Sequence, residues 1–199
     1  MPARNEDLHG MVPDQSTVAL VLIDVINDFE FGTGEQLLEH ALPVAERLAA
    51  LKRRCRTASV PAIYVNDNFG KWRSDQRTLL DHCLEDGVRG APFVRRLVPE
   101  EDDYFVLKPK HSGFFSTTLD TLLVYLKVRT LILTGLTGDI CVLFTANDAY
   151  MRDFHLVVPE DCVASADPAE NDHALRHMQR VLDADITPST SLALDRLLR

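Results

Sequence analysis

Cys141 lies in surroundings that suit a nucleophile. It follows the apolar segment Leu131–Leu136 and a turn that contains Gly135 and Gly138, and a helical pattern begins beside it. Unpaired backbone N–H groups in the first turn of a helix, together with the helix dipole, favour a thiolate and can hold a developing oxyanion. A single cysteine among apolar residues is more often a small buried hydrophobe, so this segment alone leaves both interpretations open.

Two further segments end in charged side chains that would suit such a thiol as partners. An apolar run from Val18 to Ile23 ends at Asp24, and a shorter run from Tyr104 to Leu107 ends at Lys108. Buried parallel strands have this continuous apolar pattern, and ligand sites of open α/β sheets lie at the carboxyl ends of the strands. The sequence therefore predicts that Asp24, Lys108 and Cys141 meet at one edge of a sheet.

Taken together, these segments resemble those of the isochorismatase-like cysteine hydrolases, a family that includes nicotinamidases and N-carbamoylsarcosine amidase. The family's D-x-Q-N-D-F motif matches Asp24-Val-Ile-Asn-Asp-Phe29, with isoleucine in place of the usual glutamine. Its lysine, which precedes a Ser-small-Phe triplet, matches Lys108 before Ser112-Gly-Phe114, and Lys110 is the lower-ranked alternative. Its Gly-x-x-x-x-x-Cys-Val turn matches Gly135 to Val142. The resemblance extends over most of the chain.

The resemblance implies a Cys-Asp-Lys catalytic triad that hydrolyses the C–N bond of a small amide, ureide or carbamoyl compound through a thioester. Asp24 would take the thiol proton as general base and return it to the leaving amine, and Lys108 would favour the thiolate. The backbone N–H groups of Thr137 and Cys141 would form the oxyanion hole, beside a cis Leu136–Thr137 peptide bond. Family members are usually dimers or tetramers, so a homo-oligomer is expected.

Two other functions stay open. Some members of the family cleave a vinyl ether rather than an amide, a reaction for which a protonating aspartate suffices. A non-catalytic binding scaffold with the same fold would leave Cys141 as a redox-sensitive thiol. A scaffold thiol is expected to react with a pKa near the ordinary value of about 8.5, and a catalytic thiol well below it.

Three aromatic side chains are the predicted apolar walls of a substrate pocket: Phe29, Phe114 and Trp72, the only tryptophan of the chain. Trp72 lies in the loop after the second apolar run, where a planar group would stack on it or where it simply packs the loop down. Lys71 and Arg73, in the same loop, would either receive a substrate carboxylate or be solvated.

This loop also argues against a metal site. Nicotinamidases of the family hold a divalent metal with an aspartate and two histidines after the second strand, whereas Asp67 here is followed by no histidine before His82. His173 and His177 have i, i+4 spacing on a predicted helix, but no third ligand is evident. The chain has neither the G-x-x-x-x-G-K-[ST] phosphate loop nor G-x-G-x-x-G after its first strand. No metal and no cofactor are therefore predicted.

Composition fits one compact domain that acts on a small molecule. A chain of 199 residues with 46% hydrophobic content can bury one sizeable core, which we assign to residues 16–199 after a flexible, polar arm of residues 1–15. A net charge of −9 argues against a nucleic-acid partner, and no apolar stretch approaches the roughly 20 residues that cross a bilayer. The cysteine spacing suits a reducing, cytoplasmic compartment.

Apolar β-rich runs alternate with amphipathic stretches, which predicts a three-layer, Rossmann-like α/β fold with a mostly parallel six-stranded sheet and helices on both faces. The predicted strands are Val18–Asp24, Ala62–Asn66, Tyr104–Lys108, Thr130–Leu136, His155–Pro159 and a short one near Ile186. The predicted helices are Gln36–Thr57, a piece within Gly87–Leu97, Thr117–Lys127, Ile140–Arg152, Pro168–Asp183 and Ser189–Leu198. The densest positive cluster, Arg47 to Arg56, belongs to the first helix and is expected to be a solvated face.

Overall fold

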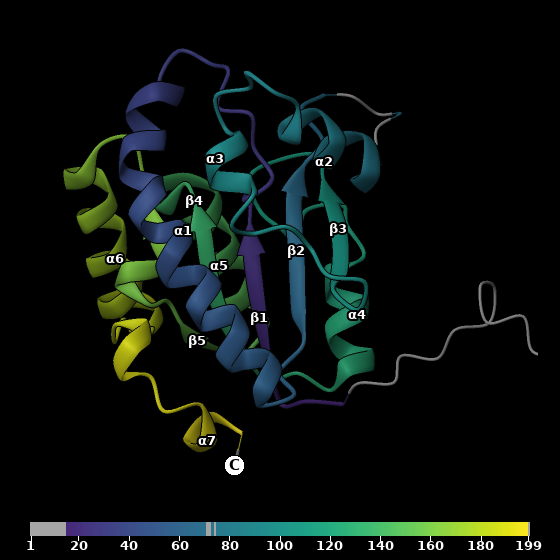
Figure 1. Cartoon of the computed structure of the whole chain (residues 1–199). Helices are drawn as coiled ribbons and strands as arrows, with labels where there is room; N and C mark the ends of the chain where they lie inside the picture. Colours follow the sequence, from purple (N-terminus) through teal and green to yellow (C-terminus); the bar gives the residue numbers. More distant parts are fainter. Residues whose placement is uncertain (1–14, 71–72, 74, 199) are drawn as a thin grey trace, which may run out of the picture.

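The computed structural model describes residues 15–70, 73 and 75–198. Its centre is a parallel sheet in the order β3-β2-β1-β4-β5, to which a two-residue β6 is added beside β4. The strands are β1 (Val18–Ile23), β2 (Ala62–Asp67), β3 (Tyr104–Lys108), β4 (Thr130–Leu136), β5 (His155–Val157) and β6 (Val163–Ala164). Each strand pairing within the described residues is parallel, so the carboxyl ends of the strands lie at one edge, at the top of Figure 1.

Helices cover both faces of the sheet and make three layers. One face carries α1 (Gly34–Thr57), α2 (Gln76–Leu84), α3 (Ala91–Val94) and α7 (Leu194–Leu197), and the other carries α4 (Leu119–Leu126), α5 (Leu143–Tyr150) and α6 (Pro168–Leu182). Figure 1 shows α1 lying diagonally across the face nearer to the viewer. None of the described helices is long and apolar enough to cross a bilayer.

The central strand β1 is buried on both sides. Val18, Leu20 and Leu22 point into the hydrophobic cluster beneath α1, and the alternating residues Ala19, Val21 and Ile23 point into the cluster beneath α4, α5 and α6. Successive side chains of a strand point to opposite faces, and helices cover both faces here. Every position of β1 is therefore apolar, which explains the continuous run that the sequence shows.

The predicted fold class is confirmed, but the sixth strand is not where the sequence placed it. Near Ile186 the structure has only a single bridge, between Val157 and Asp185, and the sixth strand is β6. A strand of two residues is too short to show a period in the sequence. The loop-like stretch after Asp75 also contains α2, a helix that the sequence reasoning did not predict.

Two predicted helices are interrupted. The stretch predicted from Ile140 to Arg152 starts as a π-helix, η1 (Gly138–Val142), and continues as α5. The stretch predicted from Ser189 to Leu198 is a short 3₁₀ turn followed by α7. Helix ends depend on local capping and packing, which the apolar pattern alone does not reveal.

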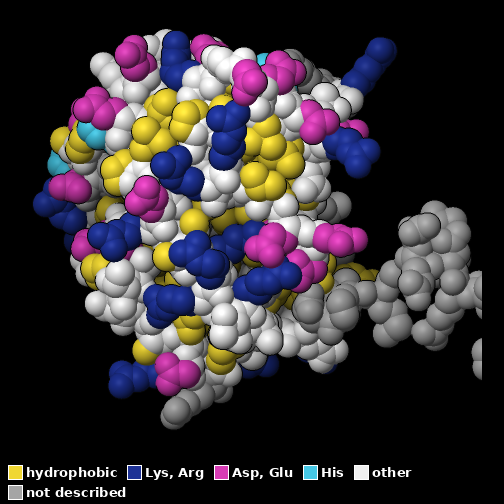
Figure 2. All heavy atoms as spheres, in the orientation of Figure 1, with side chains coloured by type: hydrophobic (Ala, Val, Ile, Leu, Met, Phe, Trp, Pro, Cys, Tyr) yellow, Lys and Arg dark blue, Asp and Glu magenta, His cyan; other side chains and the backbone are white. Residues whose placement is uncertain are grey.

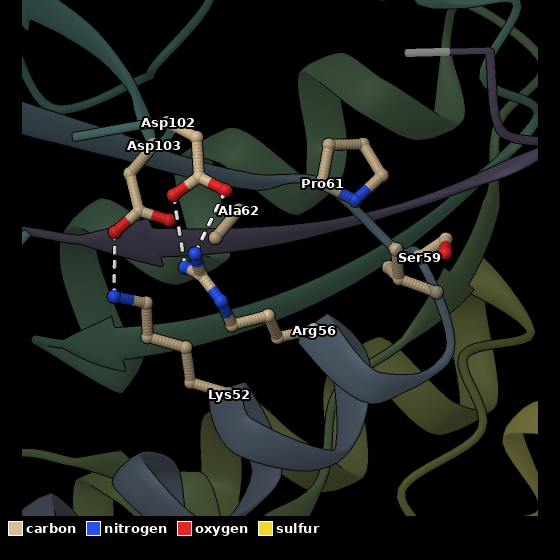
Figure 3. A pocket seen from close by; sticks show the side chains of 8 residues that line it. Lys52, Arg56, Ser59, Pro61, Ala62, Asp102 and Asp103 are labelled. Atoms are coloured by element: carbon tan, nitrogen blue, oxygen red, sulfur yellow. Dashed lines mark hydrogen bonds and ion pairs between the residues drawn. The ribbon is translucent and has the colours of Figure 1, made fainter. Parts of the chain in front are cut away.

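The positive cluster of α1 is only partly a solvated face. Arginines and lysines gather over α1 in Figure 2, but Lys52 is buried and forms ion pairs with Asp103 and Glu100. The Arg56 guanidinium donates two hydrogen bonds to the Asp102 carboxylate, each of 2.9 Å. Lys52, Arg56, Asp102 and Asp103 line a hollow beside the start of β2 (Figure 3), with a volume of about 180 Å³. The hollow therefore lies at the edge of the sheet opposite to Asp24 and Lys108.

Gly135 is a position where the fold requires glycine. Its φ is +107°, and a Cβ there would lie 2.1 Å from the carbonyl oxygen of Ile23 on the neighbouring strand. We expect Gly135→Ala to lower the free energy of unfolding by more than about 2 kcal/mol, because it adds both backbone strain and a clash with backbone. Urea denaturation followed by circular dichroism measures this change.

Gly32→Ala is the matched control for Gly135→Ala. A Cβ at Gly32 would meet nothing within 4 Å, so the free energy of unfolding should change by no more than about 0.5 kcal/mol. Equal stability of the two variants would contradict the close approach of β1 and β4 at Gly135.

Candidate active site

The carboxyl ends of β1, β3 and β4 bring three reactive side chains together. Lys108 Nζ lies 2.9 Å from Asp24 Oδ2 and 3.6 Å from Cys141 Sγ. Lys108 is fully buried, Asp24 is 6% exposed and Cys141 is half-buried. The expected convergence of these residues at one edge of the sheet is thus present. Lys110 has an exposed side chain and contributes only its carbonyl oxygen, 3.2 Å from Lys108 Nζ.

Backbone contacts hold the Asp24 carboxylate in place. Asp24 follows β1 directly and has a φ of +52°, a conformation that aspartate tolerates better than most residues. Oδ1 accepts a hydrogen bond of 2.7 Å from Asp67 N–H, which leaves Oδ2 to Lys108. The Asn66 side chain bonds both the N–H and the carbonyl oxygen of Ile26, at 3.1 and 2.7 Å. Asn66 thereby supports the loop that follows Asp24.

The lysine is a buried cation beside two carboxylates and the thiol. Burial opposes its charge, but Asp24, Cys141 and Asp67 outweigh this effect, and the pKa of Lys108 is raised above its ordinary value. Asp67 Oδ2 lies 3.4 Å from Lys108 Nζ. The side chain therefore stays protonated and places a fixed positive charge beside the thiol.

Cys141 is carried by the π-helix η1 rather than by an ordinary α-helical turn. The N–H of Val142 donates to the carbonyl oxygen of Thr137 at 3.0 Å, an i to i−5 bond. Single π turns within helices are frequent at functional sites. The Leu136–Thr137 peptide bond is cis, as the resemblance implies.

A side chain directly after β6 and one from α6 support this turn. Ser165 Oγ donates to Asp139 Oδ1 at 2.7 Å and accepts from Asp139 N–H at 3.1 Å. Asn171 Oδ1 lies against Gly138, where an added Cβ would come within 2.1 Å of it. Gly138 thus allows α6 to approach the turn. The sequence offered no signal for Ser165 or Asn171, because neither lies in a recognisable motif.

In the resting protein the pKa of the Cys141 thiol is shifted upwards. Burial and the Asp24 carboxylate raise the pKa of Cys141 above its ordinary value, and the attraction of Lys108 does not compensate. Burial likewise raises the pKa of Asp24, although Lys108 and hydrogen bonds oppose this shift. Burial thus opposes the low thiol pKa that is expected of a catalytic cysteine, and the sequence reveals the cation but not the depth of burial.

One hydroxyl beside this turn has no partner. Thr137 Oγ1 is the only buried side-chain nitrogen or oxygen among the described residues without a hydrogen bond. Buried polar groups in native proteins are rarely left unpaired, and the exceptions often mark functional positions. This hydroxyl belongs to the residue whose N–H is the proposed first oxyanion donor.

The structure places two of the predicted pocket walls in the core. Phe29 is fully buried, and its ring lies 5.2 Å from that of Phe93 on the α1 side of the sheet. Phe114 is 5% exposed, and its ring packs against Phe154 and the guanidinium of Arg152. The chain from Ser112 to Phe114 packs along α5, since Ser112 contacts Asp148 and Gly113 N–H donates to Thr145. Trp72 and Lys71 lie outside the described residues, and Arg73 is exposed.

A pocket of about 590 Å³ adjoins the ends of β1 and β2. Phe31 and Phe69, 41% and 43% exposed, are its aromatic side chains. Its polar lining includes Asp28 and His82, which are 3.1 Å apart. Sequence reasoning did not assign these residues to a pocket. Phe69 closely follows β2, which is a signal for such a lining, whereas His82 is brought there by α2. Within the described residues no group of three His, Cys, Asp or Glu side chains is arranged to hold a metal.

Residues 18–189 match the sequence model of the isochorismatase domain. The chain belongs to the isochorismatase family. It is 43% identical over 169 residues to the uncharacterized isochorismatase family protein YaaI of Bacillus subtilis strain 168, a match that covers 85% of this chain and 92% of the relative.

Two further relatives of this isochorismatase-family protein have named activities. The ureidoacrylate amidohydrolase RutB of Methylorubrum extorquens is 26% identical over 205 residues, covering 90% of this chain and 82% of the relative. The N-carbamoylsarcosine amidase of Thermoplasma acidophilum superimposes with a TM-score of 0.68 at 29% identity, covering 88% of this chain and 98% of that structure.

The electrostatics of this isochorismatase-family site predict an unusual effect of Asp24→Asn. Removing the carboxylate removes one cause of the raised thiol pKa, while burial and Lys108 remain. Alkylation of Cys141 by iodoacetamide should therefore shift to lower pH in Asp24→Asn, because the thiolate forms more readily. The rate of alkylation against pH, followed by intact mass, measures the shift.

Asp28→Asn is the control for this experiment, since Asp28 lies in the same loop but pairs with His82. Its alkylation profile should coincide with that of the unmodified protein. A profile displaced to higher pH in Asp24→Asn would contradict the assigned influence of the carboxylate on the thiol.

Proposed function

We propose that this protein is a cysteine hydrolase that cleaves the C–N bond of a small amide, ureide or carbamoyl compound through a thioester. The observation that carries the proposal is the contact of Cys141 Sγ with Lys108 Nζ, which is itself paired with Asp24. A scaffold has no need of a buried charge pair beside a thiol, because burying charges is costly. The same arrangement serves directly as nucleophile, fixed cation and base.

In the first half of the proposed reaction Asp24 acts as the base. Its carboxylate accepts the proton of Cys141 while Sγ attacks the carbonyl carbon, and the pKa of Asp24, raised by burial, makes it a better base than an exposed aspartate. The N–H groups of Thr137 and Cys141 receive the oxyanion. When the C–N bond breaks, Asp24 returns the proton to the amine, which leaves as ammonia or a small amine.

The relatives support this class of reaction. A ureidoacrylate amidohydrolase and an N-carbamoylsarcosine amidase are, by their names, enzymes that act on ureido or carbamoyl compounds. A screen of small primary amides, ureides and carbamoyl compounds for ammonia release tests the proposal. Because the resting thiol has a raised pKa, its ordinary reactivity does not distinguish an enzyme from a scaffold, and an acyl group trapped on Cys141 does.

Cys141→Ala should abolish turnover of any substrate found in this screen, since no other thiol is near Asp24 and Lys108. Cys55→Ala is the matched control: its side chain is buried beneath α1, so the change lowers stability by about 1 kcal/mol while specific activity is kept. Ammonia release by purified Cys141→Ala at the rate of the unmodified protein would exclude the thioester mechanism.

Activity should survive exhaustive treatment with EDTA. The proposed chemistry uses a thiol, a carboxylate and an ammonium group, none of which needs a metal. Ammonia release before and after chelation measures this, with a zinc-dependent hydrolase treated in parallel to show that chelation was complete. Loss of activity that zinc, iron or manganese restores would show that a metal takes part.

A further inference from the structure

A third group contacts the sulfur atom, from its solvent side. His111 Nδ1 lies 3.9 Å from Cys141 Sγ, and His111 is exposed, whereas Asp24 and Lys108 are buried. The imidazole ring lies 5.4 Å from the ring of Phe144, tilted by 54°. Because Phe144 follows Cys141 by three residues in the adjoining helix α5, the same segment carries the thiol and the ring that supports the histidine.

For the second half of the reaction, the proposed function assigns no base on the solvent side of the sulfur. Asp24 is again a carboxylate once it has returned its proton, but it is buried. A thioester on Cys141 must be attacked by water, which has to lose a proton as it attacks. Water reaches the sulfur from the solvent side, where His111 lies, since Lys108 is fully buried and Asp24 is 6% exposed. Neutral imidazole is the side chain most often used to accept such a proton.

We infer that His111 is a catalytic residue of thioester hydrolysis, an inference that rests on the proposed function. With its proton on Nε2, the imidazole presents the Nδ1 lone pair towards the sulfur. Water oxygen bonds to the carbonyl carbon, and the water proton moves to Nδ1. The tetrahedral intermediate then collapses, the C–S bond breaks, and its electron pair stays on Sγ. The imidazolium Nδ1–H returns its proton to Sγ, which gives the acid product, the thiol and neutral imidazole.

The two proposed roles match the positions of the side chains. Asp24, on the buried side of the sulfur, exchanges a proton with the thiol and the leaving amine, and His111, on the open side, accepts a proton from water. A role for His111 in packing alone would predict that substitution disturbs both halves of the reaction equally, because the position of Cys141 would change. A role as base in hydrolysis predicts that thioester formation continues while its hydrolysis slows.

The test uses p-nitrophenyl acetate, which acetylates a reactive thiol and releases coloured p-nitrophenolate at that step. His111→Gln should show a burst of about one p-nitrophenolate per protein at the rate of the unmodified protein, followed by steady turnover slower by about a hundredfold. Intact mass should show an acetyl group that persists on Cys141. In isolated acetylated His111→Ala, added imidazole should accelerate loss of the acetyl group, because the free base replaces the missing ring.

His155→Gln is the matched control, an exposed histidine at the start of β5, the opposite edge of the sheet. It should behave as the unmodified protein. Normal steady turnover by His111→Gln, or an equal loss in burst and steady rates, would overturn the role of His111 and leave the thioester mechanism standing. Failure of both the unmodified protein and His111→Gln to release p-nitrophenolate above the Cys141→Ala background, with no acetyl group on Cys141 of His111→Gln, would overturn both the role of His111 and the thioester mechanism.

Discussion

The buried ion pair between Lys108 and Asp24 is the interaction on which the site depends. A lysine and an aspartate that are both almost inaccessible to water are tolerated only when each is paired and hydrogen-bonded. Here the two atoms are 2.9 Å apart, Asp24 also accepts from Asp67 N–H, and Lys108 also donates to the carbonyl oxygen of Lys110. Loss of one partner leaves an unpaired buried charge, which costs about 3–5 kcal/mol in comparable pairs.

This pair also decides the state of the thiol. Burial and the Asp24 carboxylate raise the pKa of Cys141 and so disfavour the thiolate in the resting protein. The negative charge then appears only during the reaction, at a place where Lys108 is already fixed. Such an arrangement stabilises a developing charge without reorganisation of the surroundings. It also protects the resting thiol, because the thiolate is the form that oxidants attack.

The sequence predicted the residues whose signal is carried by the strands themselves. Asp24 follows an apolar strand that is buried on both faces, and Lys108 ends a shorter, partly buried one, so their position at the edge of the sheet follows from the pattern. The sign of the thiol pKa shift does not, because it depends on burial that only the folded chain creates. Phe29 and Phe114 were expected at a pocket, yet hydrophobicity alone does not distinguish a core ring from an exposed one.

His111 was missed for a different reason. It stands between Lys108 and the Ser-Gly-Phe triplet, outside the matched motif positions, and its contact with the sulfur depends on how the loop after β3 folds back over η1. Similarly, Ser165, directly after β6, and Asn171 of α6 support the turn although they are distant in the sequence from Cys141. Contacts of this kind arise from tertiary structure, and no local pattern encodes them.

The positions of the four cysteines allow local unfolding of one side of the sheet to be followed by thiol labelling. Cys55, Cys83 and Cys162 are fully buried in the hydrophobic layer beneath α1, whereas Cys141 packs against the layer beneath α4, α5 and α6. Labelling of the three inner thiols therefore requires the α1 side to open, and Cys141 alone has its sulfur on the other side. Exchange of the three buried thiols under native conditions would then report local unfolding of the α1 side of the sheet, separately from chemistry at Cys141.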